Sequence, residues 1–154
     1  MRVREAGLAD IPALVALRLQ LFCELGELAS PEADPALARA TRDYFTAAMQ
    51  EGNGRSWLVE VDGEAVACGT LALFVRPPYP GNLSGREAYL LNMYTRPDWR
   101  KQGMARALLE AMTRCARALK LGKLWLHASE EGRPLYERMG FAGNPDCLEW
   151  HPID

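Results

Sequence analysis

Positive side chains cluster just before the position where a helix is expected to begin. The cluster consists of Arg96, Arg100 and Lys101. A helix N-terminus carries a partial positive charge, so cations there are unfavourable unless an anion binds beside them. Asp98 is the only acidic residue between residues 88 and 109, and the small Gly103 and Ala105 let backbone N–H groups approach a phosphate closely. This pattern predicts a phosphate-binding site.

The helix that presents this site is marked by apolar spacing. Residues 103–120 carry the stripe of an amphipathic helix, made of Met104, Leu108, Ala111, Met112, Cys115 and Leu119. Strands predicted at 86–95 and 124–128 flank the helix, so the three form a right-handed crossover. The helix start then lies at the carboxyl end of the preceding strand, where open α/β sheets bind ligands. The alternative is a solvated turn in which Gly103 is only a flexible joint.

The remaining patterns predict a mixed α/β (α+β) domain over residues 1–154, with a mostly antiparallel sheet flanked by helices. The element order is β-α-α-β-β-β-α-β-α-β. The other predicted elements are a strand at 2–5, helices at 10–28 and 37–52, hairpin strands at 57–61 and 65–75, a proline-rich loop at 77–85, a short helix at 135–139 and a last strand at 146–150.

Composition excludes several classes of protein. Eighteen Lys and Arg against 20 Asp and Glu give a formal charge of −2, so there is no positive field to hold nucleic acid. Four cysteines without a Cys-x-x-Cys spacing and only two histidines argue against a metal site. Charges interrupt the start of the chain, and no apolar run approaches a membrane span. We expect a cytoplasmic protein with reduced thiols and no membrane partner.

Two segments carry a family resemblance. Residues 100–105, Arg-Lys-Gln-Gly-Met-Ala, match the Arg/Gln-x-x-Gly-x-Gly/Ala signature of the GNAT N-acetyltransferases. Residues 126–141 resemble a second family segment, with a strand, a helix tyrosine and a Gly-Phe ending in order. The element order is also similar to that fold. The resemblance therefore implies a GNAT-like acyl-CoA N-acyltransferase fold with acetyl-CoA (coenzyme A) as acyl donor.

The resemblance also implies where the coenzyme binds. The pyrophosphate is expected along Arg100, Lys101, Gln102, Gly103, Met104 and Ala105. The backbone of Met93, Tyr94 and Thr95 is expected to pair with the pantetheine arm as an added half strand, at a bulge that splays this strand from the next. Ser129 stands where many relatives carry Asn and is expected to bond the pantetheine region, or else to cap the short helix.

The catalytic expectations follow from the same resemblance. Tyr136 stands where relatives often have a tyrosine near the sulfur, which implies a general acid for the leaving thiolate. An aromatic residue at this helix position is also compatible with a core role. Relatives that use a glutamate base carry it at the position of Tyr89, so we expect Glu87, two residues earlier on the same strand face, to act through water.

The acceptor side is less defined by the sequence. Glu24 and Glu27 are expected near the end of the first helix, where they would attract a cationic substrate, or form a solvated face. Tyr79, in the proline-rich loop, and Tyr89 are candidates for the lining of the acceptor pocket. His127 is expected at the core or rim of the coenzyme slot rather than in catalysis.

These observations predict an acetyl-CoA-dependent N-acetyltransferase. The acetyl group would pass by direct attack of a primary amine in a ternary complex, with a backbone N–H near Met93 to Thr95 polarising the thioester carbonyl. The acceptor would be a small-molecule or peptide amine, and a homodimer is common in such families. The alternative is a catalytically idle acyl-CoA-binding sensor or interaction module. A dinucleotide fold is excluded, because no Gly-x-Gly-x-x-Gly follows the first strand.

Overall fold

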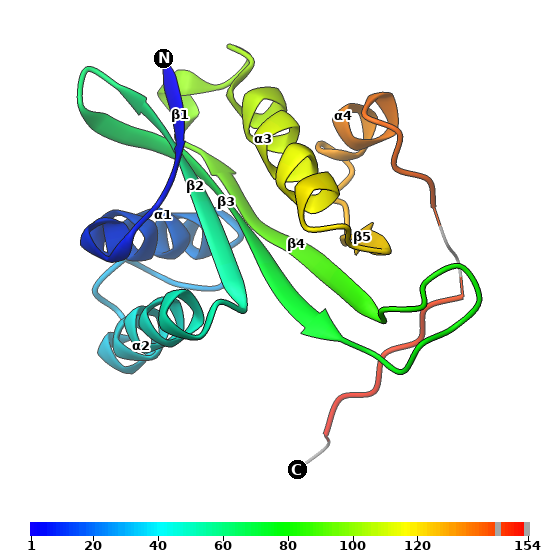
Figure 1. Ribbon diagram of the computed structural model, residues 1–154. Coiled ribbons are helices and arrows are strands. Elements are labelled where there is room, and N and C mark those ends of the chain that lie inside the picture. The colour runs from blue at the N-terminus through cyan, green and yellow to red at the C-terminus, as the bar shows by residue number, and fades with distance from the viewer. Residues whose placement is uncertain (144–145, 153–154) are drawn as a thin grey trace.

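A five-stranded sheet with helices on both faces organises the chain (Figure 1). The computed structural model describes residues 1–143 and 146–152. The strands are β1 (Arg2–Glu5), β2 (Gly54–Val61), β3 (Glu64–Val75), β4 (Arg86–Thr95) and β5 (Lys123–Trp125), in the order β1-β2-β3-β4-β5. All neighbours are antiparallel except β4 and β5, which are parallel.

The helices lie in two layers. On one face are α1 (Ile11–Glu24) and α2 (Pro35–Glu51), and on the other are α3 (Met104–Ala118) and α4 (Arg133–Arg138) (Figure 1). Two short 3₁₀ helices, η1 (Leu8–Asp10) and η2 (Pro97–Trp99), precede α1 and α3. Asp34 caps α2, because its Oδ1 accepts a hydrogen bond from the Leu37 N–H at 3.0 Å.

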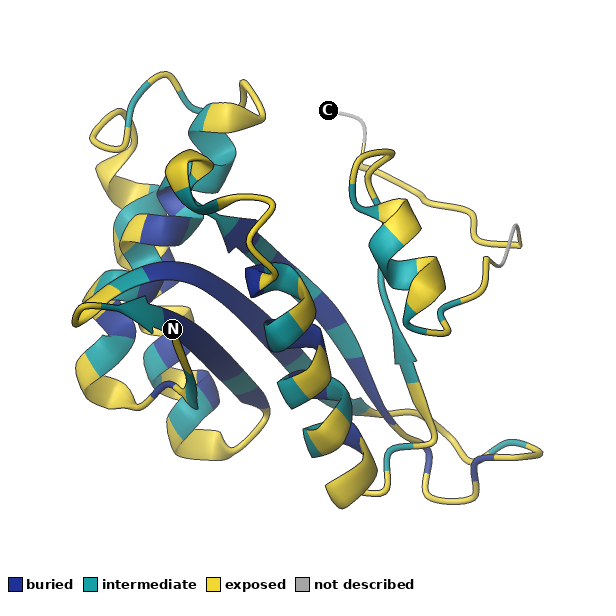
Figure 2. Cartoon of the chain, turned by 90° about the horizontal axis from the view of Figure 1, so that it is seen from above, coloured by how far each residue is buried: buried dark blue, intermediate teal, exposed yellow. Residues whose placement is uncertain are grey.

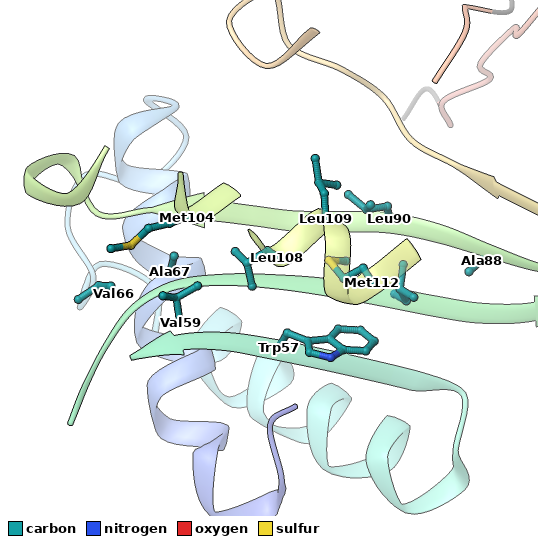
Figure 3. Close-up of a cluster of buried hydrophobic side chains, with 11 residues drawn as sticks. Trp57, Val59, Val66, Ala67, Ala88, Leu90, Met104, Leu108, Leu109 and Met112 are labelled. Carbon is teal, nitrogen blue, oxygen red and sulfur yellow. The ribbon is translucent and has the colours of Figure 1, made fainter. Parts of the chain in front are cut away.

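Alternation along the strands builds two cores. Trp57 and Val59 of β2 face α3, while Leu58 between them faces α1 and α2. The apolar stripe of α3 is buried against the sheet, as Figure 3 shows for its methionine and leucine side chains: Met104, Leu108, Leu109 and Met112. The dark central strands in Figure 2 reflect this burial on both faces.

A bulge interrupts β4 in the middle of the sheet. Cys68 pairs with Tyr94, but the next pair is Thr70 with Leu91, so β4 carries one extra residue. Asn92 takes up this extra length with a φ of +59°, a left-handed conformation that Asn tolerates better than most residues. The bulge expected from the family resemblance is therefore present.

The structure corrects three element predictions. Helix α1 ends at Glu24 rather than near residue 28, and β5 ends at Trp125 rather than at 128. The strand expected at 146–150 is not formed, although these residues are described. Leu148 and Trp150 are 96% and 83% exposed, so the apolar side chains that suggested a strand have no sheet face against which to pack.

Candidate active site

Strands β4 and β5 separate after a short paired stretch. Only Glu87–Tyr89 pair with Lys123–Trp125, and among the described residues the segment 90–95 of β4 has no partner strand on this side. Free backbone N–H and C=O groups on such an edge can pair with an extended ligand. Met93, Tyr94 and Thr95 all lie in this segment.

The loop after β4 leads directly to the start of α3, which has an uncompensated positive end. Gly103 is the N-cap residue, with a φ of +82°, and Lys101 has a φ of +59°. No side chain caps the first turn, and the first turn contains no acidic residue. Met104 is buried and anchors the helix, while Lys101, Gln102 and Gly103 are exposed. The free N–H groups of this turn can therefore receive an anion.

Arg100 is held by other parts of the chain. Its Nε donates to the Thr95 carbonyl at 2.9 Å, its guanidinium forms an ion pair with Glu24, and it lies 5.8 Å from the centre of the Tyr94 ring. Glu24, which was expected to attract a cationic substrate, is therefore paired with Arg100 in this structure. Among the described residues, Lys101 has no ion-pair partner, so it is the cation whose charge remains available.

Helix α4 brings Tyr136 to an open cavity of about 640 Å³, which is lined by residues of β5, of α4 and of 141–143 and 146–147. The Tyr136 ring packs edge-on against Phe141, with 5.8 Å between ring centres. Burial raises the pKa of Tyr136, and nearby Tyr89 raises it further. No described residue hydrogen-bonds the Tyr136 hydroxyl. This residue thus packs through its ring and presents a hydroxyl without a partner among the described side chains at the cavity.

Ser129 lies before α4 and stabilises the first turn of this helix. The Ser129 Oγ accepts a hydrogen bond from the Gly132 N–H at 3.1 Å, and the Ser129 carbonyl accepts one from Arg133 at 2.9 Å. This is the capping alternative considered for this residue. Its side chain is exposed, so a contact with a bound coenzyme is also sterically open.

Glu87 occupies a different environment from the one expected of a water-linked base. Its side chain is 0% exposed and accepts hydrogen bonds from Tyr79, Arg76 and Trp125, the last two at 3.1 Å. Burial alone would raise the pKa of Glu87, but the bonds from Tyr79 and Arg76 outweigh it and hold the pKa below its ordinary value. Glu87 lies about 20 Å along β4 from Met93, taking ~3.3 Å per residue.

Tyr79 and Tyr89 also have structural partners. Because Tyr79 bonds Glu87, it fixes the proline-rich loop against the sheet. The Tyr89 hydroxyl lies 2.6 Å from Nδ1 of His127, at the point where β4 and β5 separate. The other ring nitrogen of His127 lies 4.0 Å from the exposed Cys147 thiol. Glu27 has no side-chain partner among the described residues and lies beyond the end of α1.

Sequence reasoning missed four residues around the bulge. Arg18 of α1 donates from Nη1 to Oδ1 of Asn92 at 3.3 Å, and Nδ2 of Asn92 donates to Oγ1 of Thr70 at the same distance. Gly69 lies opposite the bulge, where a Cβ would come within 2.6 Å of the Met93 sulfur. The signal that was available is Asn92 itself, because Asn is disfavoured inside strands and favoured at positive φ.

Comparison with known proteins agrees with this geometry. A family model described as the acetyltransferase (GNAT) family matches residues 22–141. The chain belongs to this family. Among solved structures, this GNAT acetyltransferase is similar to a predicted acetyltransferase from Clostridium acetobutylicum crystallised with acetyl-CoA, at 29% identity, over 97% of this chain and 95% of that one, with a TM-score of 0.87.

A second solved relative is a GCN5-related N-acetyltransferase from Ralstonia eutropha JMP134, at 26% identity, over 99% of this chain and 97% of that one, with a TM-score of 0.80. A search of curated proteins gave no significant match.

The predictions of the family, of the mixed α/β GNAT fold, of an N-acetyltransferase activity and of acetyl-CoA as donor are confirmed. Within the described residues, no helix combines the length and apolar character that a membrane crossing requires.

Proposed function

We propose that this GNAT acetyltransferase transfers an acetyl group from acetyl-CoA to the primary amine of a small-molecule or peptide acceptor, by direct attack in a ternary complex. The observation that carries this proposal is the continuity of two features. The free backbone edge of β4 leads, through the loop that follows Thr95, directly to the uncapped start of α3.

The residues along this path fit the two ends of a coenzyme. At α3, the N–H groups from Gln102 to Ala105 and the charge of Lys101 suit a pyrophosphate, with Arg100 available if it leaves Glu24. On β4, the N–H and C=O groups of Met93 and the N–H of Thr95 suit the amides of the pantetheine arm, while the Thr95 carbonyl already accepts the hydrogen bond from Arg100.

Acetyl-CoA supplies an activated acyl group in the form of a thioester. A backbone N–H at the bulge, from Met93 to Thr95, polarises the carbonyl as the amine nitrogen attacks it. The new C–N bond forms as the C–S bond breaks, and the amine loses a proton to solvent water. Tyr136 donates its hydroxyl proton to the leaving thiolate and regains one from solvent. Glu87 takes no part in this scheme, because its buried carboxylate is already engaged by hydrogen bonds from Arg76, Tyr79 and Trp125.

A homodimer also belongs to this proposal. The segment after α4 exposes Leu148 and Trp150 almost fully, and large apolar side chains of this kind favour association. Light scattering on the purified chain measures the mass directly, and a monomer at every concentration would remove this part of the proposal without affecting the catalytic part.

The decisive experiment measures binding and turnover separately. Calorimetric titration with acetyl-CoA tests the coenzyme site, and release of free coenzyme A over a panel of primary amines tests catalysis. Saturable binding together with amine-dependent release supports the enzyme. Binding without release for any amine would identify the chain as an acyl-CoA sensor, and absence of binding would refute both readings.

The anion site is tested by Lys101→Asn, because Asn removes the charge while tolerating the positive φ of this position. We expect acetyl-CoA affinity to fall several-fold and its salt dependence to weaken, since one screened charge contact is lost. The matched control is Arg114→Gln, which removes one positive charge from the exposed face in the middle of α3. Equal affinity of Lys101→Asn and the control would place the pyrophosphate elsewhere.

A further inference from the structure

Helices α1 and α2 cover the face of the sheet opposite α3 (Figure 1). A second cavity lies between these helices and the sheet. Its volume is about 290 Å³, at the lower end for small-molecule sites. It is lined by side chains of both helices and of the β4 bulge, including Arg18, Thr41, Tyr44, Thr70, Leu91 and Asn92. The cavity therefore reaches from the helices to the bulge.

Among the described residues that line this cavity, Arg18 is the only one with a formal charge. Its guanidinium makes one long hydrogen bond to Asn92, at 3.3 Å, and lies 4.8 Å from the centre of the Phe22 ring. None of the described Asp or Glu side chains forms an ion pair with it. A guanidinium carries five N–H donors, so most of the donor capacity of Arg18 remains free at the cavity.

The ionisable side chains nearest to Arg18 are Cys68 and Tyr44, and neither carries a negative charge that would neutralise it. Burial raises the pKa of the Cys68 thiol to about 12, so this side chain stays uncharged at neutral pH. Burial also raises the pKa of Tyr44 above its ordinary value, and its hydroxyl stays protonated. Arg18 itself has a pKa lowered by burial, but a guanidinium remains charged in proteins. A half-buried charge without a counter-charge is costly unless a ligand supplies the counter-charge.

The cavity also has the right position for an acceptor. Asn92, which receives the Arg18 hydrogen bond, is the residue immediately before Met93, where the backbone edge of β4 is free. A bound molecule could therefore place one functional group at Arg18 and a second one at the backbone edge of β4, a short distance away. The small volume restricts that molecule to a few heavy atoms beyond its two functional groups.

From these observations we propose that the acceptor is a small primary amine that also carries an anionic group, a carboxylate or a phosphate, which Arg18 binds. This inference rests on the proposed acetyl transfer and narrows its substrate class. The hydroxyl of Tyr44, which has no hydrogen-bond partner among the described residues, provides a further donor at the cavity.

The test compares amines in matched pairs at a fixed concentration of acetyl-CoA. Amino acids are paired with their amides, and aminoalkyl phosphates with the corresponding amino alcohols. We expect kcat/KM for the anionic member to exceed that of its neutral partner by about 10- to 100-fold, the size of a charge-assisted hydrogen bond. A preference confined to the amino acids identifies a carboxylate, and one confined to the aminoalkyl phosphates identifies a phosphate.

The variant Arg18→Gln assigns that preference to the guanidinium. We expect it to remove most of the discrimination within each pair, because the larger loss of kcat/KM falls on the anionic member. Arg18→Lys keeps the charge but loses the planar fork, so an intermediate preference is expected. The control Arg39→Gln removes an exposed positive charge from α2 outside the cavity and should behave as the wild type.

A readout without turnover guards against misfolding of a variant. Saturation-transfer NMR with the anionic amines and coenzyme A should show binding to wild type and a loss of that binding in Arg18→Gln, with acetyl-CoA affinity unchanged. Turnover of neutral and anionic amines at equal rates would overturn this inference while leaving acetyl transfer intact. Absence of turnover and of acetyl-CoA binding would instead overturn the proposed function itself. Equal losses in Arg18→Gln for both members of a pair would also overturn the inference, since they would indicate a structural role.

Discussion

The hydroxyl of Tyr136 combines two properties that are rarely found together in a packed side chain. Its ring is held by Phe141, which fixes its direction, while no described residue hydrogen-bonds its oxygen. The raised pKa keeps the proton on the oxygen throughout the neutral range. A rigid, protonated donor at the wall of a cavity is what protonation of a leaving thiolate requires.

Tyr136→Phe should therefore lower kcat by about 10- to 100-fold and leave the KM for acetyl-CoA within about twofold, because the ring packing is retained while the proton donor is lost. Steady-state kinetics with one fixed amine measures both constants. Since the pKa of Tyr136 lies above its ordinary value, the wild type should lose this step only above about pH 10. A parallel loss of kcat and acetyl-CoA affinity would assign Tyr136 to packing.

Among the elements, the bulge in β4 lies between the unpaired edge of this strand and the cavity that Arg18 lines. One extra residue turns the Asn92 side chain toward Arg18 and Thr70, and the Met93 sulfur toward the space left by Gly69. The left-handed backbone at Asn92 is the local cause of this arrangement. The bulge should therefore respond to backbone preference more than to side-chain size.

A pair of substitutions separates these two effects. Asn92→Ala should be less stable than Asn92→Gly by about 0.5–1 kcal/mol, because an L side chain at positive φ costs more than the entropy that glycine loses. Urea unfolding of both variants measures the difference. At Tyr89, where the backbone is ordinary strand, the Ala variant should be the more stable one. The same order at both positions would show that the bulge imposes no left-handed requirement.

In the molecule as a whole, a network of ion pairs connects strand β1 to η1 and β2. Arg4 forms ion pairs with Asp10 of η1, at 2.7 Å, and with Glu60 of β2, and the three side chains are 28%, 17% and 18% exposed. The hydrogen bond from Arg4 is the main cause that lowers the pKa of Asp10 to about 2. A group with a lowered pKa stabilises the folded state above its unfolded pKa.

Asp10→Asn should therefore reduce the free energy of unfolding by about 1–2 kcal/mol at pH 7. The wild type keeps this contribution above about pH 4 and loses it as the pH falls toward 2, the folded pKa of Asp10. The gap between wild type and variant should close over that window when unfolding is followed against pH. A constant gap down to pH 2 would mean that the carboxylate charge is not its source.

How far the sequence predicts this molecule depends on whether a signal is local. The apolar period of α3 and the cations before Gly103 are local, and both the helix and its exposed start are present. The strand expected at 146–150 is not formed. A local sequence pattern cannot show whether a partner strand is available to pair with it. Glu87 illustrates the same limit, since its strand face is predictable but the closure of Tyr79 over it is not. The contact between Arg18 and Asn92 joins residues too far apart in sequence for any local pattern.

The separation of β4 from β5 after Tyr89 has a consequence for inhibitor design. In the proposed complex the donor lies on the α3 side and the acceptor lies over α1 and α2, so the two molecules would approach the β4 bulge from opposite surfaces of the sheet. A compound that joins a donor-site part to an acceptor-site part would have to pass between β4 and β5. The length of its linker is therefore set by the thickness of a single β-sheet. Either half could be elaborated outward without meeting the other.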